Sequence, residues 1–247
     1  SEVKTFGKTE CVTSVLVFLL NYLILVCMVV LFLWMDTQGQ AQSFRDYVAE
    51  NYNTVIYLLA SVFLLVLTIY FYYVFEDKTL LASPKSIWLV FMLLDVCILI
   101  CYFFGYFFNI YSRPIALLAL LALMLLSRRD AIFLNVIFAL MMFSIDRFSN
   151  FSNIEQYETA LSSTPLLTFS AGMVGIFVGS KVKTRLRSFL TGFAVSIPIL
   201  VMVACLEFNR GIGVVYLLLY GLEAGVLSSV LFMALLPVYE TLFNRIT

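Results

Sequence analysis

Long runs of apolar residues, interrupted by short polar or charged clusters, follow one another along the 247-residue chain. Most runs approach the ~20 apolar residues that an α-helix needs to cross a bilayer. With charges, prolines and glycine clusters as boundaries, the pattern predicts eight membrane helices. They are expected at about residues 11–35, 54–75, 86–108, 114–127, 130–146, 165–180, 188–206 and 212–236. The predicted fold is therefore an all-α, polytopic membrane helical bundle.

The predicted helices at 114–127 and 130–146 are short for a full crossing. They flank the tripeptide Arg128-Arg129-Asp130. A re-entrant hairpin is the alternative, but it would carry two arginines into the bilayer, which is costly. At the end of the chain, Pro237 is predicted to mark where the last helix bends or ends.

The distribution of basic residues predicts which side of the membrane each loop faces, because Lys and Arg collect in cytoplasmic loops. With the N-terminus inside, eleven of the fifteen cations fall on the inner side. The four outer cations are Arg45, Arg113, Arg147 and Arg210. We therefore expect a multi-pass protein of the plasma membrane with cytoplasmic N- and C-termini.

A basic cluster, KVKTRLR, lies between the sixth and seventh predicted helices. Its cations are Lys181, Lys183, Arg185 and Arg187. On the predicted inner face this loop meets anionic lipid headgroups. A topological anchor is the favoured interpretation, and a specific lipid or partner site is the alternative.

Composition excludes several classes of function. Residues of hydrophobic type make up 63% of the chain, and fifteen cations balance fifteen anions, so no basic field favours nucleic acid. Histidine is absent, which removes Ser-His-Asp, Cys-His and HExxH sites. Cys97 and Cys101 have the i, i+4 spacing of a soft metal site but no third ligand nearby. We therefore expect no catalytic residues, no metal and no cofactor in this chain.

Two carboxylates, Asp95 and Glu223, lie deep within apolar runs. A charge at that depth costs several kcal/mol, so each is expected to face the bundle interior as a protonated, hydrogen-bonded carboxyl. Such residues often mark a ligand, ion or proton site. A ligand pocket bounded by the third and eighth predicted helices, with both carboxylates on its wall, and a purely structural hydrogen bond are both left open. Asn21 and Asn135 are expected to form hydrogen bonds between helices.

Small residues recur at every fourth position in two predicted helices. The first set is Ala171, Gly175 and Gly179, and the second is Gly221, Gly225 and Ser229. Such stripes are flat faces on which two helix backbones approach closely. We expect packing within one bundle, with a homodimer contact as the alternative.

Three stretches together resemble a known family. They read RPIALLALLALMLLSRRDAIFLNVIFALM, then GMVGIFVGSKVKTRLRSFLTGF, then GLEAGVLSSVLFMALLPVYETLF. Their order resembles the seven-helix membrane module of the 7TM-HD family, bacterial membrane-anchored HD-domain phosphodiesterases that degrade cyclic di-AMP. The segment LLPVYETLF at 235–243 is the most specific match, and the likeness covers about residues 54–247.

The resemblance implies a division of the chain into two parts. Residues 1–53 would form a cytoplasmic tail, an anchor helix and a short extracellular loop, and residues 54–247 a seven-helix sensor module. Two features depart from the family. Only residues 36–53 stand where the family has a large extracellular domain, and no histidine is present to ligate the metals of an HD site. No catalytic residue of the family can therefore be carried over.

These observations favour a signal-input module. It would receive a small-molecule or lipid ligand and transmit the signal to a cytoplasmic effector domain or partner protein. The alternative is a small-molecule or proton-coupled transporter, which unpaired carboxylates would also suit. Transporters often contain repeated halves with interrupted helices, and no such duplication is visible here. An intramembrane enzyme is disfavoured, because the chain lacks histidine and a G-x-S-x-G motif.

Overall fold

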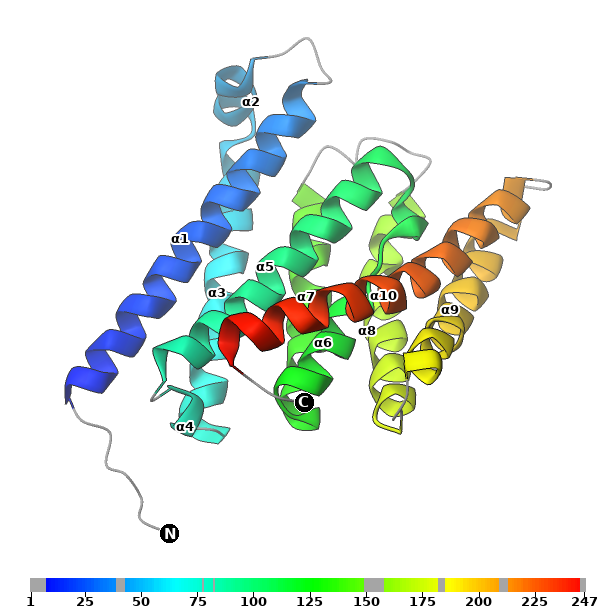
Figure 1. The fold of residues 1–247 in the computed structure, drawn as a ribbon. Coiled ribbons are helices and arrows are strands. Elements are labelled where there is room, and N and C mark those ends of the chain that lie inside the picture. Colours follow the sequence, from blue (N-terminus) through cyan, green and yellow to red (C-terminus); the bar gives the residue numbers. More distant parts are fainter. Residues whose placement is uncertain are drawn as a thin grey trace. The chain divides into compact units, whose positions relative to one another are not determined.

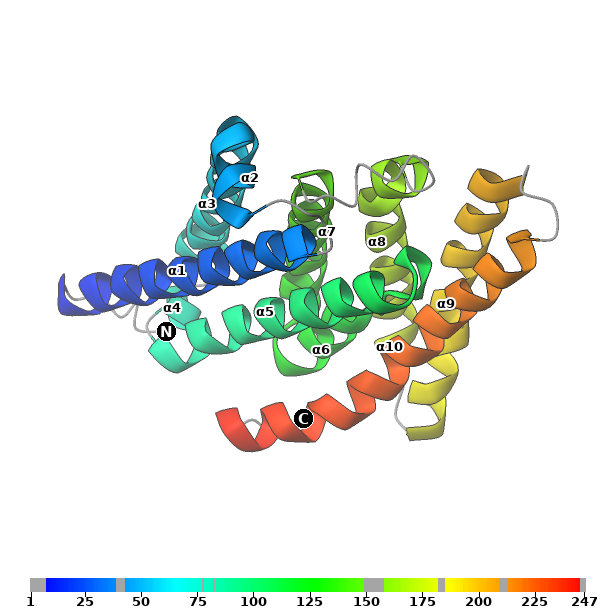
Figure 2. The same ribbon diagram turned by 90° about the horizontal axis from the view of Figure 1, so that it is seen from above.

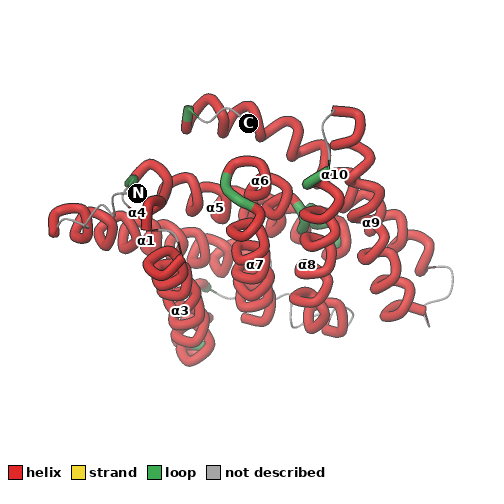
Figure 3. Tube along the Cα trace, turned by 90° about the horizontal axis from the view of Figure 1, so that it is seen from below, coloured by secondary structure: helices red, strands yellow, loops and turns green. Residues whose placement is uncertain are grey.

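The apolar runs fold as helices because a helix satisfies its own backbone hydrogen bonds where no water is available. The computed structural model describes residues 8–38, 43–76, 78–81, 83–148, 158–181, 185–208 and 213–244. Throughout these ranges the regular structure is helical, as Figure 3 shows by colour, and no strand occurs in them. The chain divides into two compact units, residues 1–92 with 148–150 and residues 93–147 with 151–247.

The first unit contains two long helices and two short ones. Its elements are α1 (Lys8–Gln38), α2 (Phe44–Glu50), α3 (Tyr52–Glu76), α4 (Lys78–Leu81) and the first part of α5 (Pro84–Phe107). α1 packs against α3 (Figure 1). The hydroxyl of Ser14 in α1 donates to the carbonyl of Leu81 over 2.8 Å, which fixes α1 against the end of α4.

The short helix α2 follows α1 and contacts both α1 and α3. Ser43 caps it, because its hydroxyl accepts a hydrogen bond from the backbone N–H of Asp46. Tyr47 is buried, and burial, with a smaller contribution from the carboxylate of Asp36, raises the pKa of its hydroxyl. This helix lies in the stretch for which the sequence predicts only a polar loop.

The second unit is built from the rest of α5 and the helices that follow it. They are η1 (Ile110–Ser112), α6 (Leu117–Leu125), α7 (Arg128–Phe148), α8 (Glu158–Gly179), α9 (Arg185–Glu207) and α10 (Gly213–Phe243). α6 is apolar on all sides because it is surrounded by protein: seven of its nine residues are buried. It packs against α8 and α10.

Six of the described helices are long and apolar enough to cross a membrane. These spans are residues 12–37, 52–76, 84–107, 160–179, 187–207 and 213–243. With α6 and α7, which are shorter or less apolar, all eight predicted helices are present. The prediction of an all-α membrane bundle is confirmed. At nine residues, or about 14 Å, α6 is too short to cross the ~30 Å hydrocarbon core alone.

Two prolines lie inside helices rather than at their ends. α8 begins at Glu158, so Pro165 does not start it, and α10 continues past Pro237 to Phe243. Membrane helices tolerate such prolines because neighbouring hydroxyls and helices satisfy the freed backbone groups. The sixth helix therefore starts before the expected residue 165, and the eighth does not end at the expected residue 236, while a bend at Pro237 stays a prediction.

Among the described helices, the most extensive contact joins α9 and α10, which lie side by side in Figures 1 and 2. A Cβ atom on Gly192 would lie 2.8 Å from the carbonyl oxygen of Gly225, and one on Gly225 would lie 2.5 Å from that of Gly192. The hydroxyl of Ser196 donates to the carbonyl of Leu222 across the same contact over 3.1 Å. Only glycine fits where two backbones approach so closely.

Replacing Gly225 by leucine is expected to force α9 and α10 apart and to lower the free energy of unfolding by about 2 kcal/mol or more. The measurement is reversible unfolding of the protein in detergent micelles. Ala234→Leu is the matched control, because Ala234 is exposed on the same helix. Equal stability of the two variants would contradict the close contact.

Candidate functional site

The first carboxylate singled out in the sequence, Asp95, lies in the middle of α5. Its Oδ1 atom is buried and has no hydrogen-bond partner among the described residues. The buried Tyr239 of α10 lies near enough to interact electrostatically with Asp95 and Cys97. Asp95 therefore faces the C-terminal part of α10.

The second carboxylate, Glu223, is half-buried on α10 itself. Along that helix it is about 24 Å from Tyr239, at a rise of 1.5 Å per residue. Because Asp95 lies beside Tyr239, the structure does not bring the two carboxylates together. A ligand role for each carboxylate stays a prediction, but the two carboxylates would belong to two separate sites in the bundle.

A buried ion pair is the most polar feature of the second unit. The Arg113 guanidinium donates to the carboxylate of Asp146, with 2.6 Å between Nη1 and Oδ2. The two side chains are 2% and 0% exposed. Arg113 directly follows η1, and Asp146 lies in the last turn of α7. The pair therefore ties the link between α5 and α6 to the end of α7.

The residues around the Arg113 guanidinium and its partner carboxylate leave room for the pair and interact with it. A Cβ atom on Gly105 of α5 would lie 2.8 Å from the Arg113 Cζ atom, so glycine is required there. Cys101 and Tyr102 lie close enough to interact with the same group electrostatically. On the other side, the Thr164 hydroxyl of α8 is within hydrogen-bonding reach of the Asp146 carboxylate. Three helices thus converge on this pair.

A second carboxylate holds the same segment. The Tyr111 hydroxyl donates to Oε1 of Glu207, the last residue of α9, over 2.7 Å, and both side chains are 3% exposed. The side-chain oxygen of Asn109 caps η1 by accepting from the Tyr111 backbone N–H over 3.0 Å. We call residues 109–113 the connector. It is fastened to α7 by Asp146 and to α9 by Glu207.

The connector was not predicted from the sequence. Arg113 was expected as a cation of an outer loop, and the structure instead buries it. The available signal was the predicted topology, which places Arg113, Asp146 and Glu207 on one side of the membrane at the ends of apolar runs. A single sequence does not reveal which of these helix ends meet.

The two membrane asparagines behave differently. The amide of Asn135 in α7 donates to the carbonyl of Phe169 in α8 over 3.1 Å, which is the expected bond between helices. A Cβ atom on Gly172 would overlap this amide, so that glycine also has a packing role. Asn21 instead donates to Val17 in its own helix over 2.8 Å. The expectation of an interhelical bond was wrong for Asn21.

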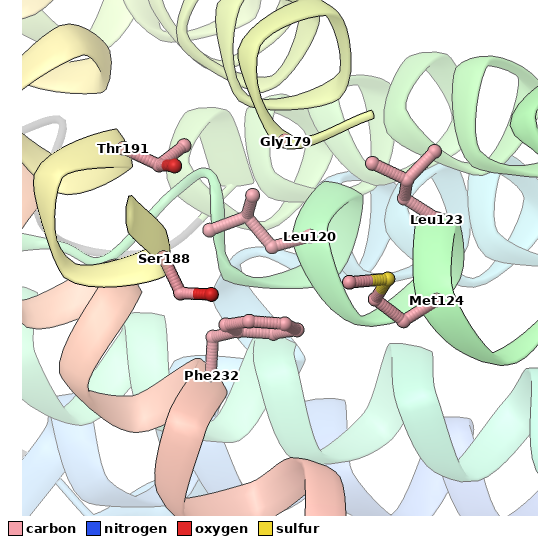
Figure 4. Close-up of a pocket in the computed structure, with 7 residues that line it drawn as sticks. All are labelled: Leu120, Leu123, Met124, Gly179, Ser188, Thr191 and Phe232. Carbon is pink, nitrogen blue, oxygen red and sulfur yellow. The ribbon is translucent and has the colours of Figure 1, made fainter. Parts of the chain in front are cut away.

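The predicted small-residue stripes face neighbouring helices of the second unit. Gly175 lies against Leu120 and Val195, and Ala171 is fully buried. Gly179 borders a cavity of only about 10 Å³, where α6, α8, α9 and α10 meet (Figure 4). The labelled side chains that line it are Leu120, Leu123, Met124, Ser188, Thr191 and Phe232. At most one water fits such a space, so this meeting point is packed rather than open to a ligand.

The basic cluster is described only in part. Lys181 is exposed just after α8, Arg185 begins α9, and Arg187 is exposed on its first turn. Lys183 lies outside the described residues. Within the described part of the chain, no group of three or more His, Cys, Asp or Glu residues could hold a metal ion.

Comparison with known proteins identifies the family. The family described as "7TM receptor with intracellular HD hydrolase" matches residues 52–247. The chain belongs to that family. No curated protein and no solved structure matches it.

The match covers the receptor part of the family. It begins at Tyr52, the first residue of α3, and includes the connector, Asp95, Glu223 and all of α10. α1 lies outside it. The resemblance drawn from the three sequence stretches is confirmed for the membrane module of this 7TM-HD family.

A double-mutant cycle tests the buried pair. Asp146→Leu leaves the Arg113 charge without its partner and is expected to cost about 3–5 kcal/mol of unfolding free energy, whereas Arg113→Met with Asp146→Leu removes both charges and is expected to cost much less. Unfolding in micelles measures each variant. If the double variant is as unstable as the sum of the single ones, the two side chains are not coupled.

Proposed function

We propose that the chain is the signal-input and transmission module of a bacterial 7TM-HD receptor. It couples an extracellular or membrane signal to a cytoplasmic effector, which in the family is an HD hydrolase and here is proposed to degrade cyclic di-AMP. The observation that supports this most is the connector, a charged segment held inside an apolar bundle. Ionisable groups at such places are rarely retained for stability alone.

A receptor needs two arrangements that differ by only a few kcal/mol and a ligand that binds one of them better. The connector suits such an equilibrium, because each of its two fastenings depends on one carboxylate. A ligand that competed for Arg113 or Tyr111 would release one fastening. In this proposal the carboxylates set how strongly the connector resists rearrangement.

The route from the connector to the effector is α10. η1 packs against this helix, which is 31 residues or about 46 Å long and runs to Phe243. Asp95 meets it again near Tyr239. A shift at the connector would therefore move a continuous element, with Pro237 as its weakest turn. We place Asp95 and Glu223 on this route as ligand-pocket candidates.

Asp95→Asn and Glu223→Gln in the intact receptor test the pocket roles. Each is expected to change the response of cyclic di-AMP hydrolysis to the signal by about fivefold or more, the lower end of typical allosteric coupling. Asp46→Asn, which makes the same change at an exposed carboxylate of α2, is expected to have no effect. An unchanged response in both test variants would exclude a pocket role for the two carboxylates.

A transporter is the competing function, and uptake separates the two. The chain reconstituted in proteoliposomes is expected to move neither small solutes nor protons, because a sensor needs no open path through the bundle. Uptake that disappears in Asp95→Asn would replace the receptor proposal with proton-coupled transport.

We also propose that the protein resides in the plasma membrane with both termini in the cytoplasm. Reporter enzymes fused within residues 181–187 are expected to be active only in the cytoplasm, because the four cations there favour the inner side. Fusions next to Arg45 and Asp46, which are exposed on α2 on the predicted outer side, provide the opposite signal. Periplasmic activity at 181–187 would invert the proposed topology.

A further inference from the structure

A cavity of about 230 Å³ lies between α1 and α3 in the first unit. Two aromatic contacts bridge the helices around it. The rings of Phe18 and Tyr70 are 5.1 Å apart, and those of Tyr22 and Phe63 are 5.5 Å apart, both edge to face. The remaining lining residues are Val15, Leu19, Val66 and Leu67. We call this space the α1–α3 groove.

The wall of the groove offers no hydrogen bond. No polar atom of its lining residues faces the cavity. The Tyr22 hydroxyl is directed to the backbone carbonyl of Leu59, 3.5 Å away. A polar ligand would lose its hydration there without compensation, so only a hydrocarbon is suited to the groove. A cavity of ~150 Å³ with apolar walls already accepts benzene, and this one is larger.

The groove opens toward the bilayer. Its residues 15–22 and 63–70 lie within the spans 12–37 and 52–76. At its rim Leu19 is 50% exposed, Phe63 45% and Val15 39%. These side chains belong to the lipid-facing surface of the two helices, so the cavity is continuous with the hydrocarbon of the membrane. Whatever enters it comes from that phase.

We propose that the α1–α3 groove binds one acyl chain of a bilayer phospholipid. At about 230 Å³ the space is smaller than one turn of a further helix, which is about 10 Å across and about 5.4 Å long, whereas a single extended hydrocarbon chain is narrow enough. The bound chain lies between α1, which is outside the family match, and α3, the first helix inside it. This inference does not depend on the proposed signalling function.

Photo-crosslinking in vesicles tests the proposal. The full chain is reconstituted in phosphatidylethanolamine and phosphatidylglycerol that carry a diazirine on one acyl chain, and adducts are located by peptide mass spectrometry. Adducts are expected to concentrate on the groove residues. Leu67→Trp fills the groove and is expected to reduce them severalfold. Leu64→Trp, at an exposed position on the same helix, is the matched control and should leave them unchanged.

A second variant acts in the opposite direction. Val66→Ala enlarges the groove and is expected to increase adduct formation there, so the proposal can be tested even if Leu67→Trp does not fold. Adducts spread equally over Leu16, Leu64 and the groove, with no response to either groove variant, would overturn it. Adducts joining two copies of the chain at these residues would also overturn it, in favour of a dimer contact.

Discussion

The hydrocarbon of a bilayer provides no water for charges, and the buried pair of Arg113 and Asp146 is where that constraint acts most strongly on this chain. The arginine must find its counter-ion on another helix, and Gly105 must lack a side chain to leave room for it. The same constraint explains why Tyr111 is paired with Glu207. The position of the connector follows from these requirements.

The other contacts of the second unit hold its helices together around the connector. The fastenings at α7 and α9 hold one end of the bundle, and the glycine contact between Gly192 and Gly225 holds α9 against α10. α10 also contacts η1 and passes Asp95. α10 thus contacts the connector and α9 and passes near Asp95 of α5, and it is the element along which we propose that a rearrangement travels.

Hydrophobic runs were enough to predict eight helices, because hydropathy and length are properties of one helix at a time. They also pointed to Asn135, whose amide has few alternatives in an apolar run. They could not locate the partner of Arg113, since a pairing between helices depends on how the helices pack. The helix boundaries predicted at Pro165 and Pro237 were wrong because the surrounding helices override the preference of proline for helix ends. α6 was predicted too long at both ends, because residues 114–116 and 126–127 are not helical.

The packing of the connector requires Asp146 to be an ionised carboxylate paired with Arg113 inside the bundle. Isotope-edited infrared spectroscopy of the aspartates, with Asp146→Asn as the difference reference, measures its state directly in reconstituted protein. We expect a carboxylate stretching band from Asp146 that shifts or disappears in Arg113→Met. A protonated carboxyl band from Asp146 in the unaltered chain, unchanged by Arg113→Met, would contradict it.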